Sequence, residues 1–185
     1  MFLIYPAYGV QIHELVLCFK EGTKILTDKG YVCIEDLCKN DLVKTELNDC
    51  ISISISISIK EIGWSNYDMK NIFHTKNKLH LLKIDNFPEL IEDLIITGCH
   101  SILVPELSPK QRALILDDYK IIYITGNRYR LPAYICDKTQ IYEGPCKKIW
   151  HLALENANEQ SNYGIYANGL LVESCSIRTI NYFLE

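Results

Sequence analysis

The side chains of this chain best suited to nucleophilic chemistry belong to its eight cysteines and five histidines. A cysteine thiolate is a strong nucleophile, but a peptide bond resists its attack because the amine is a poor leaving group. Catalysis must therefore stabilise the oxyanion or protonate the departing nitrogen. A histidine held by a small hydroxyl residue at a strand end can supply that proton, and Thr97 and His100 form such a Thr-x-x-His pattern between apolar segments.

Three segments of the chain follow one another in an order typical of a known family. The first begins at Cys18 and reads CFKEGTKILT over residues 18–27, then GYVCIEDL over 30–37 and NDLVKT over 40–45. The second is TGCHSILV over 97–104, and the third combines WHLALE at 150–155 with NYGIYANGLLVESC at 162–175. They resemble, in turn, the first block, the Thr-x-x-His block and the closing blocks of Hint (Hedgehog/intein) domains. The resemblance spans nearly everything from Cys18 to Cys175.

The resemblance implies an autoprocessing reaction at the Leu17–Cys18 peptide bond. In it, the Cys18 thiolate attacks the Leu17 carbonyl in an N-to-S acyl shift, and water, a thiol, an amine or a sterol hydroxyl then resolves the thioester. His100 is expected to protonate the departing amine, and Thr97 to hold the scissile amide. His151 occupies a position where many inteins carry an aspartate, so we expect it beside the active site. The activity is self-directed, with the chain's own peptide bond as substrate, and needs neither a cofactor nor a metal.

The closing block departs from that of splicing inteins at its last two residues. Splicing inteins end with His-Asn, and the asparagine side chain cyclises to release the downstream segment; here the corresponding residues are Glu173 and Ser174. Because serine has no amide to cyclise, standard splicing is expected to fail. The endpoint then resembles that of Hedgehog-type domains, and the ending is most similar to stand-alone Hint domains of large DNA viruses and bacteria. Cys175 is a second thiol without an assigned role, for which pairing with Cys18 in a disulfide is a hypothesis.

The elements that must position these residues are predominantly strands. Apolar or alternating segments are punctuated by Gly, Asn, Asp and Pro, which favour turns. These segments predict an all-β domain, and the resemblance implies a Hint-like fold, a horseshoe of two pseudo-symmetric β-subdomains whose ends meet centrally. A helical turn is expected at 34–38, a helix from Ser108 as N-cap with Pro109 at its first position, and a hairpin at Asn168–Gly169. Residues 61–78 have no clear period and predict a loop. Strands are expected at 23–27, 31–34, 42–45, 51–59, 79–84, 95–97, 102–104, 120–124 and 150–154.

Length and composition agree with one folded domain. The chain has 185 residues, of which 48% are hydrophobic and 23% charged, enough to bury a core. The expected organisation is an upstream flank at 1–17, a Hint domain at 18–176 and a C-terminal tail at 177–185. A net charge of -4 without a basic stripe argues against nucleic-acid binding. No apolar run reaches membrane-spanning length and no basic segment precedes the apolar start, so we expect an intracellular, cytoplasmic monomer, in the host cytoplasm if the protein is viral.

Three other functions fit the same residues. The chain could be an inactive Hint scaffold that serves as a binding or assembly module, or a splicing element that uses an unusual terminal residue. It could also be a β-rich viral structural protein with incidental motifs, in which case Cys18 should be buried away from His100. Isolated residues also have structural explanations, since a cysteine is commonly a small buried hydrophobe. The residues given such a packing or surface role are Cys33, Cys38, Cys50, Cys136, Cys146, His13, His74 and His80.

Overall fold

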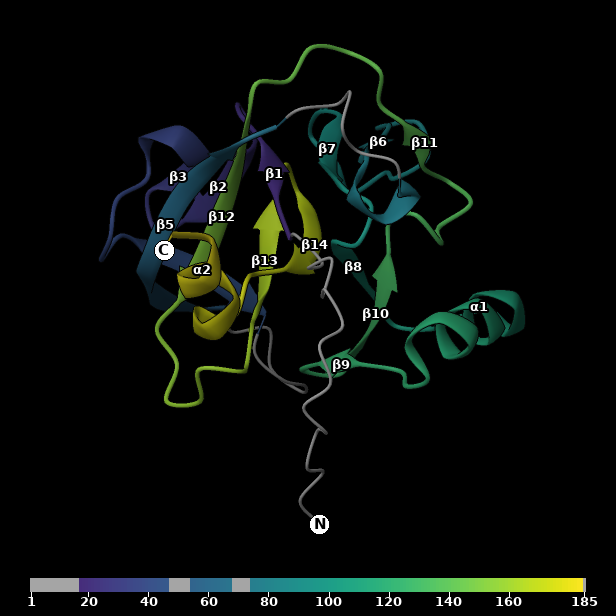
Figure 1. Cartoon of the computed structure of the whole chain (residues 1–185). Coiled ribbons are helices and arrows are strands. Elements are labelled where there is room, and N and C mark those ends of the chain that lie inside the picture. The colour runs from purple at the N-terminus through teal and green to yellow at the C-terminus, as the bar shows by residue number, and fades with distance from the viewer. Residues whose placement is uncertain (1–16, 47–53, 68–73, 185) are drawn as a thin grey trace.

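The computed structural model describes residues 17–46, 54–67 and 74–184, and these form a mostly β structure (Figure 1). Every pairing between its strands is antiparallel, and one path of hydrogen-bonded neighbours runs β11-β6-β7-β1-β12-β5-β4-β2-β13-β14-β8-β10-β9, with β3 paired to β2. The all-β class predicted from the sequence is confirmed. The strands are β1 Phe19–Lys20, β2 Lys24–Thr27, β3 Gly30–Cys33, β4 Leu42–Glu46, β5 Ser54–Asn66, β6 Leu79–Leu82, β7 Leu94–Thr97, β8 Ser101–Val104, β9 Ile124–Thr125, β10 Arg128–Pro132, β11 Gln140–Ile141, β12 Lys148–Leu154, β13 Gly164–Ala167 and β14 Leu170–Glu173.

The long strand β5 joins two groups of strands. Its first part pairs with β4, and its second part pairs with β12 from Leu154↔Ile59 to Lys148↔Asn66. The loop predicted over 61–78 is therefore wrong for residues 61–66, because pairing with β12 extends the strand through a polar sequence whose own period is unclear. Ile59 is buried, whereas Ile57 and the serines beside it are half-buried. Residues 51–53 of the predicted strand lie outside the described residues.

The described residues include two α-helices. Helix α1, Pro109–Tyr119, lies at the periphery and begins with the predicted Ser108 cap, whose side chain accepts a hydrogen bond from the Gln111 N–H (Figure 1). Lys120 ends it in the left-handed conformation with φ 61°, so the strand predicted over 120–124 is wrong except at Ile124. Short 3-10 helices cover Ile34–Asp36, within the predicted turn, and Thr75–Asn77.

The second helix, α2, covers Ile177–Leu184, where the sequence predicted a tail. It packs against β5 and β12, and the Ile177 and Ile180 side chains are buried in a small cluster with Ala153 and Cys175 (Figure 1). Leu17 is partly buried against the same cluster. This C-terminal segment is therefore a packed part of the folded domain.

The hairpin between β13 and β14 holds two strands that lead to the functional site. Asn168 and Gly169 both have positive φ, 46° and 94°, as expected for the two central residues of a tight hairpin turn. The Asn168 side chain accepts a hydrogen bond from the Lys24 N–H at 2.7 Å and donates to the Asp93 carbonyl at 2.9 Å. These bonds tie the hairpin to β2 and to the residue before β7, which fixes β14 in place.

The main hydrophobic core lies between the strands that carry the candidate residues. Phe19, Ile96 and Leu152, from three neighbouring strands, are fully buried in it. Within the described ranges, no helix has the length and apolarity to span a membrane.

Candidate active site

Strand pairing alone brings Cys18 opposite Thr97 and His151. In β1, Phe19 pairs with Ile96 of β7 and with Trp150 of β12, both antiparallel. In an antiparallel pair, stepping back one residue on one strand steps forward one on the other. Cys18 therefore lies level with Thr97 on one side and with His151 on the other, and its side chain is fully buried.

Thr97 forms two hydrogen bonds with the backbone of Cys18, one with its N–H and one with its carbonyl. The Cys18 N–H, which belongs to the Leu17–Cys18 peptide bond, donates to the Thr97 hydroxyl at 3.1 Å. The Thr97 N–H donates to the Cys18 carbonyl, also at 3.1 Å. The first contact holds the Leu17–Cys18 peptide and the second holds the Cys18–Phe19 peptide against β7.

His151 places its imidazole beside the Cys18 thiol. Its Nδ1 lies 3.3 Å from the Cys18 sulfur, and its Nε2 lies 3.0 Å from the Ser65 hydroxyl. Burial lowers the pKa of His151 to about 4, outweighing a hydrogen bond with the Leu17 backbone, so the ring is neutral near pH 7. Burial also raises the pKa of the Cys18 thiol well above its usual value, with a smaller contribution from Cys175. The resting pair is a thiol next to a neutral imidazole that can accept its proton.

His100 lies on the other side of Cys18, between two carbonyl groups. Its Nδ1 is 3.3 Å from the Cys18 oxygen and its Nε2 is 2.7 Å from the Glu173 backbone oxygen. An imidazolium would donate to both oxygens, whereas a neutral ring can donate to only one. Burial nevertheless lowers the pKa of His100, against the opposing influence of Glu173. The ring also contacts the edge of Phe19, with centroids 4.4 Å apart.

The Leu17 carbonyl is in contact with the Cys175 thiol. The Cys175 sulfur lies 3.1 Å from the Leu17 oxygen, so the two ends predicted to meet do meet. Both Cys18 and Cys175 are free thiols in the structure. His100 and Cys175 are therefore both adjacent to the Leu17–Cys18 segment, which contradicts the arrangement expected of a structural protein with incidental motifs.

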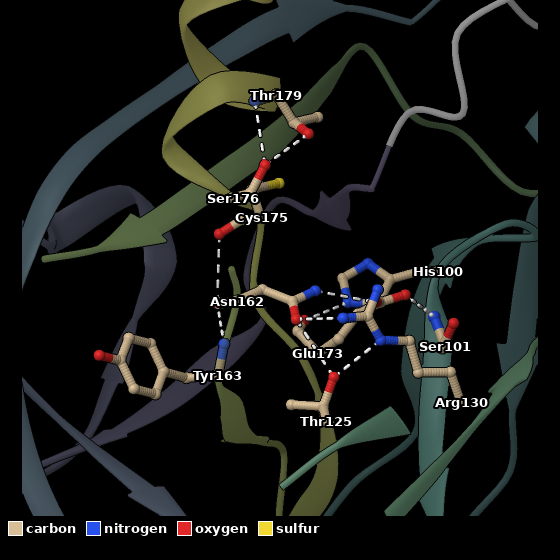
Figure 2. Close-up of polar contacts among 11 residues, drawn as sticks. His100, Ser101, Thr125, Arg130, Asn162, Tyr163, Glu173, Cys175, Ser176 and Thr179 are labelled. Carbon is tan, nitrogen blue, oxygen red and sulfur yellow. Dashed lines mark hydrogen bonds and ion pairs between the residues drawn. The ribbon is translucent and has the colours of Figure 1, made fainter. Parts of the chain in front are cut away.

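Glu173 is the member of this region whose role the sequence did not predict. Its buried carboxylate accepts hydrogen bonds from the Ser101 N–H and the Asn162 side chain, both at 2.9 Å, and lies 3.2 Å from the Arg130 guanidinium (Figure 2). Arg130 is also held by the Thr125 hydroxyl at 2.7 Å. The network fixes the backbone of Ser101, the residue after His100. A single acid at the end of the apolar strand LLVE, two residues before a cysteine, was the available signal.

Ser174 occupies the position that the cyclising asparagine has in splicing inteins. Its side chain is fully buried; the hydroxyl accepts from the Tyr163 N–H at 3.0 Å and donates to the Cys175 carbonyl at 3.2 Å. Here the residue has a structural role in placing Cys175.

The remaining candidates have the packing or surface positions expected of them, with two outside the described residues. His80 is buried and contacts the Thr139 hydroxyl at 3.2 Å, whereas His74 is exposed. Cys136 is buried in the main core, and Cys33, Cys38 and Cys146 are partly or fully exposed. His13 and Cys50 lie outside the described residues.

Comparison with known proteins gives matches in structure only. No protein-family model matches the sequence, and no curated protein does either. A bacterial intein-like domain from Clostridium thermocellum is 19% identical with a TM-score of 0.47, covering 86% of this chain and 99% of its own. A DnaB intein from Synechocystis sp. PCC 6803 is 14% identical with a TM-score of 0.48, again covering 86% and 99%. The gp41-1 intein is 11% identical with a TM-score of 0.44, covering 85% and 98%.

Proposed function

We propose that this chain is an autoprocessing Hint-type domain that cleaves its own Leu17–Cys18 bond through a thioester. The observation that carries the proposal is the position of the Cys18 thiol, 3.3 Å from a neutral imidazole and on a residue whose own N–H is bound by Thr97. A general base at this distance can take the thiol proton as the sulfur attacks.

The reaction has two chemical stages. His151 accepts the Cys18 thiol proton, the sulfur bonds to the Leu17 carbonyl carbon, and the carbon–nitrogen bond breaks. The imidazolium form of His100 supplies a proton to the Cys18 nitrogen, and the proton that His151 accepted then restores His100, so the first stage is an isomerisation from amide to thioester. Water, a thiol, an amine or a sterol hydroxyl then takes the acyl group and restores the Cys18 thiol.

The substrate of this reaction is the same polypeptide. Such cleavage takes place within one molecule, so its rate constant is expected to be independent of protein concentration. A tenfold dilution that slowed the reaction would indicate cleavage between molecules instead.

The direct test is the intact mass of the purified chain, incubated with and without dithiothreitol and hydroxylamine. We expect cleavage before Cys18 that both nucleophiles accelerate, with hydroxylamine leaving a hydroxamate on Leu17. Cys18→Ala should abolish it, whereas Cys136→Ala, which removes a buried thiol from the main core, should not.

Other outcomes would identify the alternative functions. A full-length mass in every sample would overturn the proposal and favour an inactive binding or assembly module. A product that joins residues 1–17 to the segment after Ser174 would indicate splicing without an asparagine at that position.

A further inference from the structure

The Leu17 oxygen is the atom that gains negative charge when Cys18 attacks, and the Cys175 thiol lies 3.1 Å from it. Donors preorganised around such an oxygen commonly contribute a large share of the rate enhancement in acyl transfer. We propose that the Cys175 thiol is a catalytic hydrogen-bond donor that stabilises this oxyanion, and that it does not act as a second nucleophile. This inference rests on the proposed cleavage at Leu17–Cys18.

The protonation state of Cys175 suits a donor. Its side chain is 1% exposed, and burial raises the pKa of the thiol to about 12. At neutral pH the S–H proton is therefore retained, and only the protonated form can donate to a carbonyl oxygen. A nucleophile in the same place would first have to lose that proton to a base, and the imidazole of His151 is already 3.3 Å from the Cys18 sulfur.

Cys175 is held in place by contacts on both sides along the chain. Its N–H donates to the Leu152 carbonyl at 2.8 Å, and Ala153 and Cys175 form a parallel bridge. Next in the chain, the Ser176 hydroxyl accepts from the Thr179 N–H at 3.1 Å, which holds the first turn of α2 (Figure 2). A donor fixed in this way needs little reorganisation during the reaction.

Helix α2 therefore belongs to the catalytic unit. Buried Ile177 and Ile180 anchor the helix in the cluster that Leu17 also contacts. The segment after Cys175 positions both the Cys175 donor and Leu17. A cleavage that released this segment would remove the contacts that hold these two residues. Cleavage before Cys18 alone is the outcome that this arrangement favours.

The proposed step balances without any change to Cys175. As the sulfur–carbon bond forms, the carbonyl electron pair moves onto the Leu17 oxygen, which accepts a stronger hydrogen bond from the Cys175 S–H. When the tetrahedral species collapses, the carbon–nitrogen bond breaks and the carbonyl is restored. The proton of Cys175 stays on sulfur throughout.

The kinetic test compares Cys175→Ser with Cys175→Ala in the full-length chain, using hydroxylamine to capture the thioester as it forms. Serine keeps an O–H donor, so we expect cleavage within about threefold of the parent rate, whereas alanine should slow it by about tenfold to hundredfold. Cys136→Ala is the control for loss of a buried thiol. A nucleophilic Cys175 predicts the opposite pattern: acyl transfer to position 175 in the parent, and an unchanged first step in Cys175→Ala.

A second measurement reads the contact without cleavage. The chain carries Cys18→Ala, and its leucines are labelled at the carbonyl carbon and its alanines at nitrogen, so that Leu-Ala peptide bonds can be singled out. This chain has two such bonds, at 17–18 and 152–153. Adding Cys175→Ala should shift the Leu17 carbonyl resonance and leave that of Leu152, whose partner is the Cys175 backbone N–H, unchanged. An unmoved Leu17 resonance would overturn the inference, whereas a parent chain inert to hydroxylamine would overturn the proposed function.

Discussion

His151 is the side chain that we propose as the general base for Cys18. It is fully buried, and its neutral ring lies between the Cys18 sulfur and the Ser65 hydroxyl. His151→Gln keeps a polar side chain of similar size but removes the base. We expect hydroxylamine-driven cleavage to slow by about 10² to 10⁴ fold, as measured by intact mass over time. Parent-like cleavage in a folded His151→Gln chain would assign the base elsewhere.

The buried acid Glu173 is expected to stabilise the domain through its charge. Glu173→Gln leaves Arg130 without its counter-charge in a site where the carboxylate side chain is 3% exposed. The expected loss is about 2 kcal/mol in the free energy of unfolding, measured with urea. The matched control is Glu92→Gln, whose ion pair with Lys24 is exposed and should change stability by less than about 1 kcal/mol. Equal losses in both variants would contradict this role.

Sequence reasoning grouped candidate residues that belong to short motifs. Cys18, Thr97, His100 and His151 lie together as expected: Thr97 ends β7, Cys18 and His100 directly precede β1 and β8, and His151 lies inside β12. Glu173 was interpreted only as a departure from the pattern of splicing inteins. Its partner Arg130 lies outside the three motif segments and Asn162 only begins the third, so only the folded structure could bring them together with Glu173.

At the element scale, α2 is expected to support both stability and cleavage. Ile180 is fully buried at its centre, so Ile180→Ala should cost about 2–4 kcal/mol and slow cleavage by loosening the segment that carries Cys175. Urea unfolding and hydroxylamine cleavage measure the two effects. Ile121→Ala, at a site that is 48% exposed, should change stability by no more than about 0.5 kcal/mol. A chain with Ile180→Ala that cleaved at the parent rate would separate the helix from catalysis.

The elements that sequence reasoning missed are those determined by distant partners. The hairpin at Asn168 and the cap at Ser108 are encoded locally and were predicted. Residues 61–66 and α2 were not, because β12 extends β5, and α2 forms where its apolar side chains can pack on β5 and β12. Tertiary pairing overrides weak local preferences in such segments.

At the scale of the whole molecule, the buried histidines make stability depend on pH. Burial lowers the pKa of His80, His100 and His151 in the folded chain, whereas the unfolded value is about 6.5. Between these values the unfolded chain binds more protons, so the free energy of unfolding falls as the pH is lowered from about 6.5 towards 4. Each such histidine contributes up to about 1.4 kcal/mol per pH unit.

Urea titrations at several pH values between 7 and 4 check this dependence. His151→Gln should make the free energy of unfolding depend less steeply on pH, because one of the three histidines no longer titrates. Equal stability of the parent chain across the whole range would contradict the buried neutral state of these histidines.

The contact between Cys175 and Leu17 joins residues 158 positions apart, and this separation orders events in time. A ribosome makes the Leu17–Cys18 bond before it makes the residues around Cys175 that complete its surroundings. Under the proposed function, we expect the nascent chain to keep this bond until the segment that carries Cys175 has emerged and folded. Products truncated before Cys175 should keep their upstream segment, so separation of the two parts would report that synthesis reached at least Cys175.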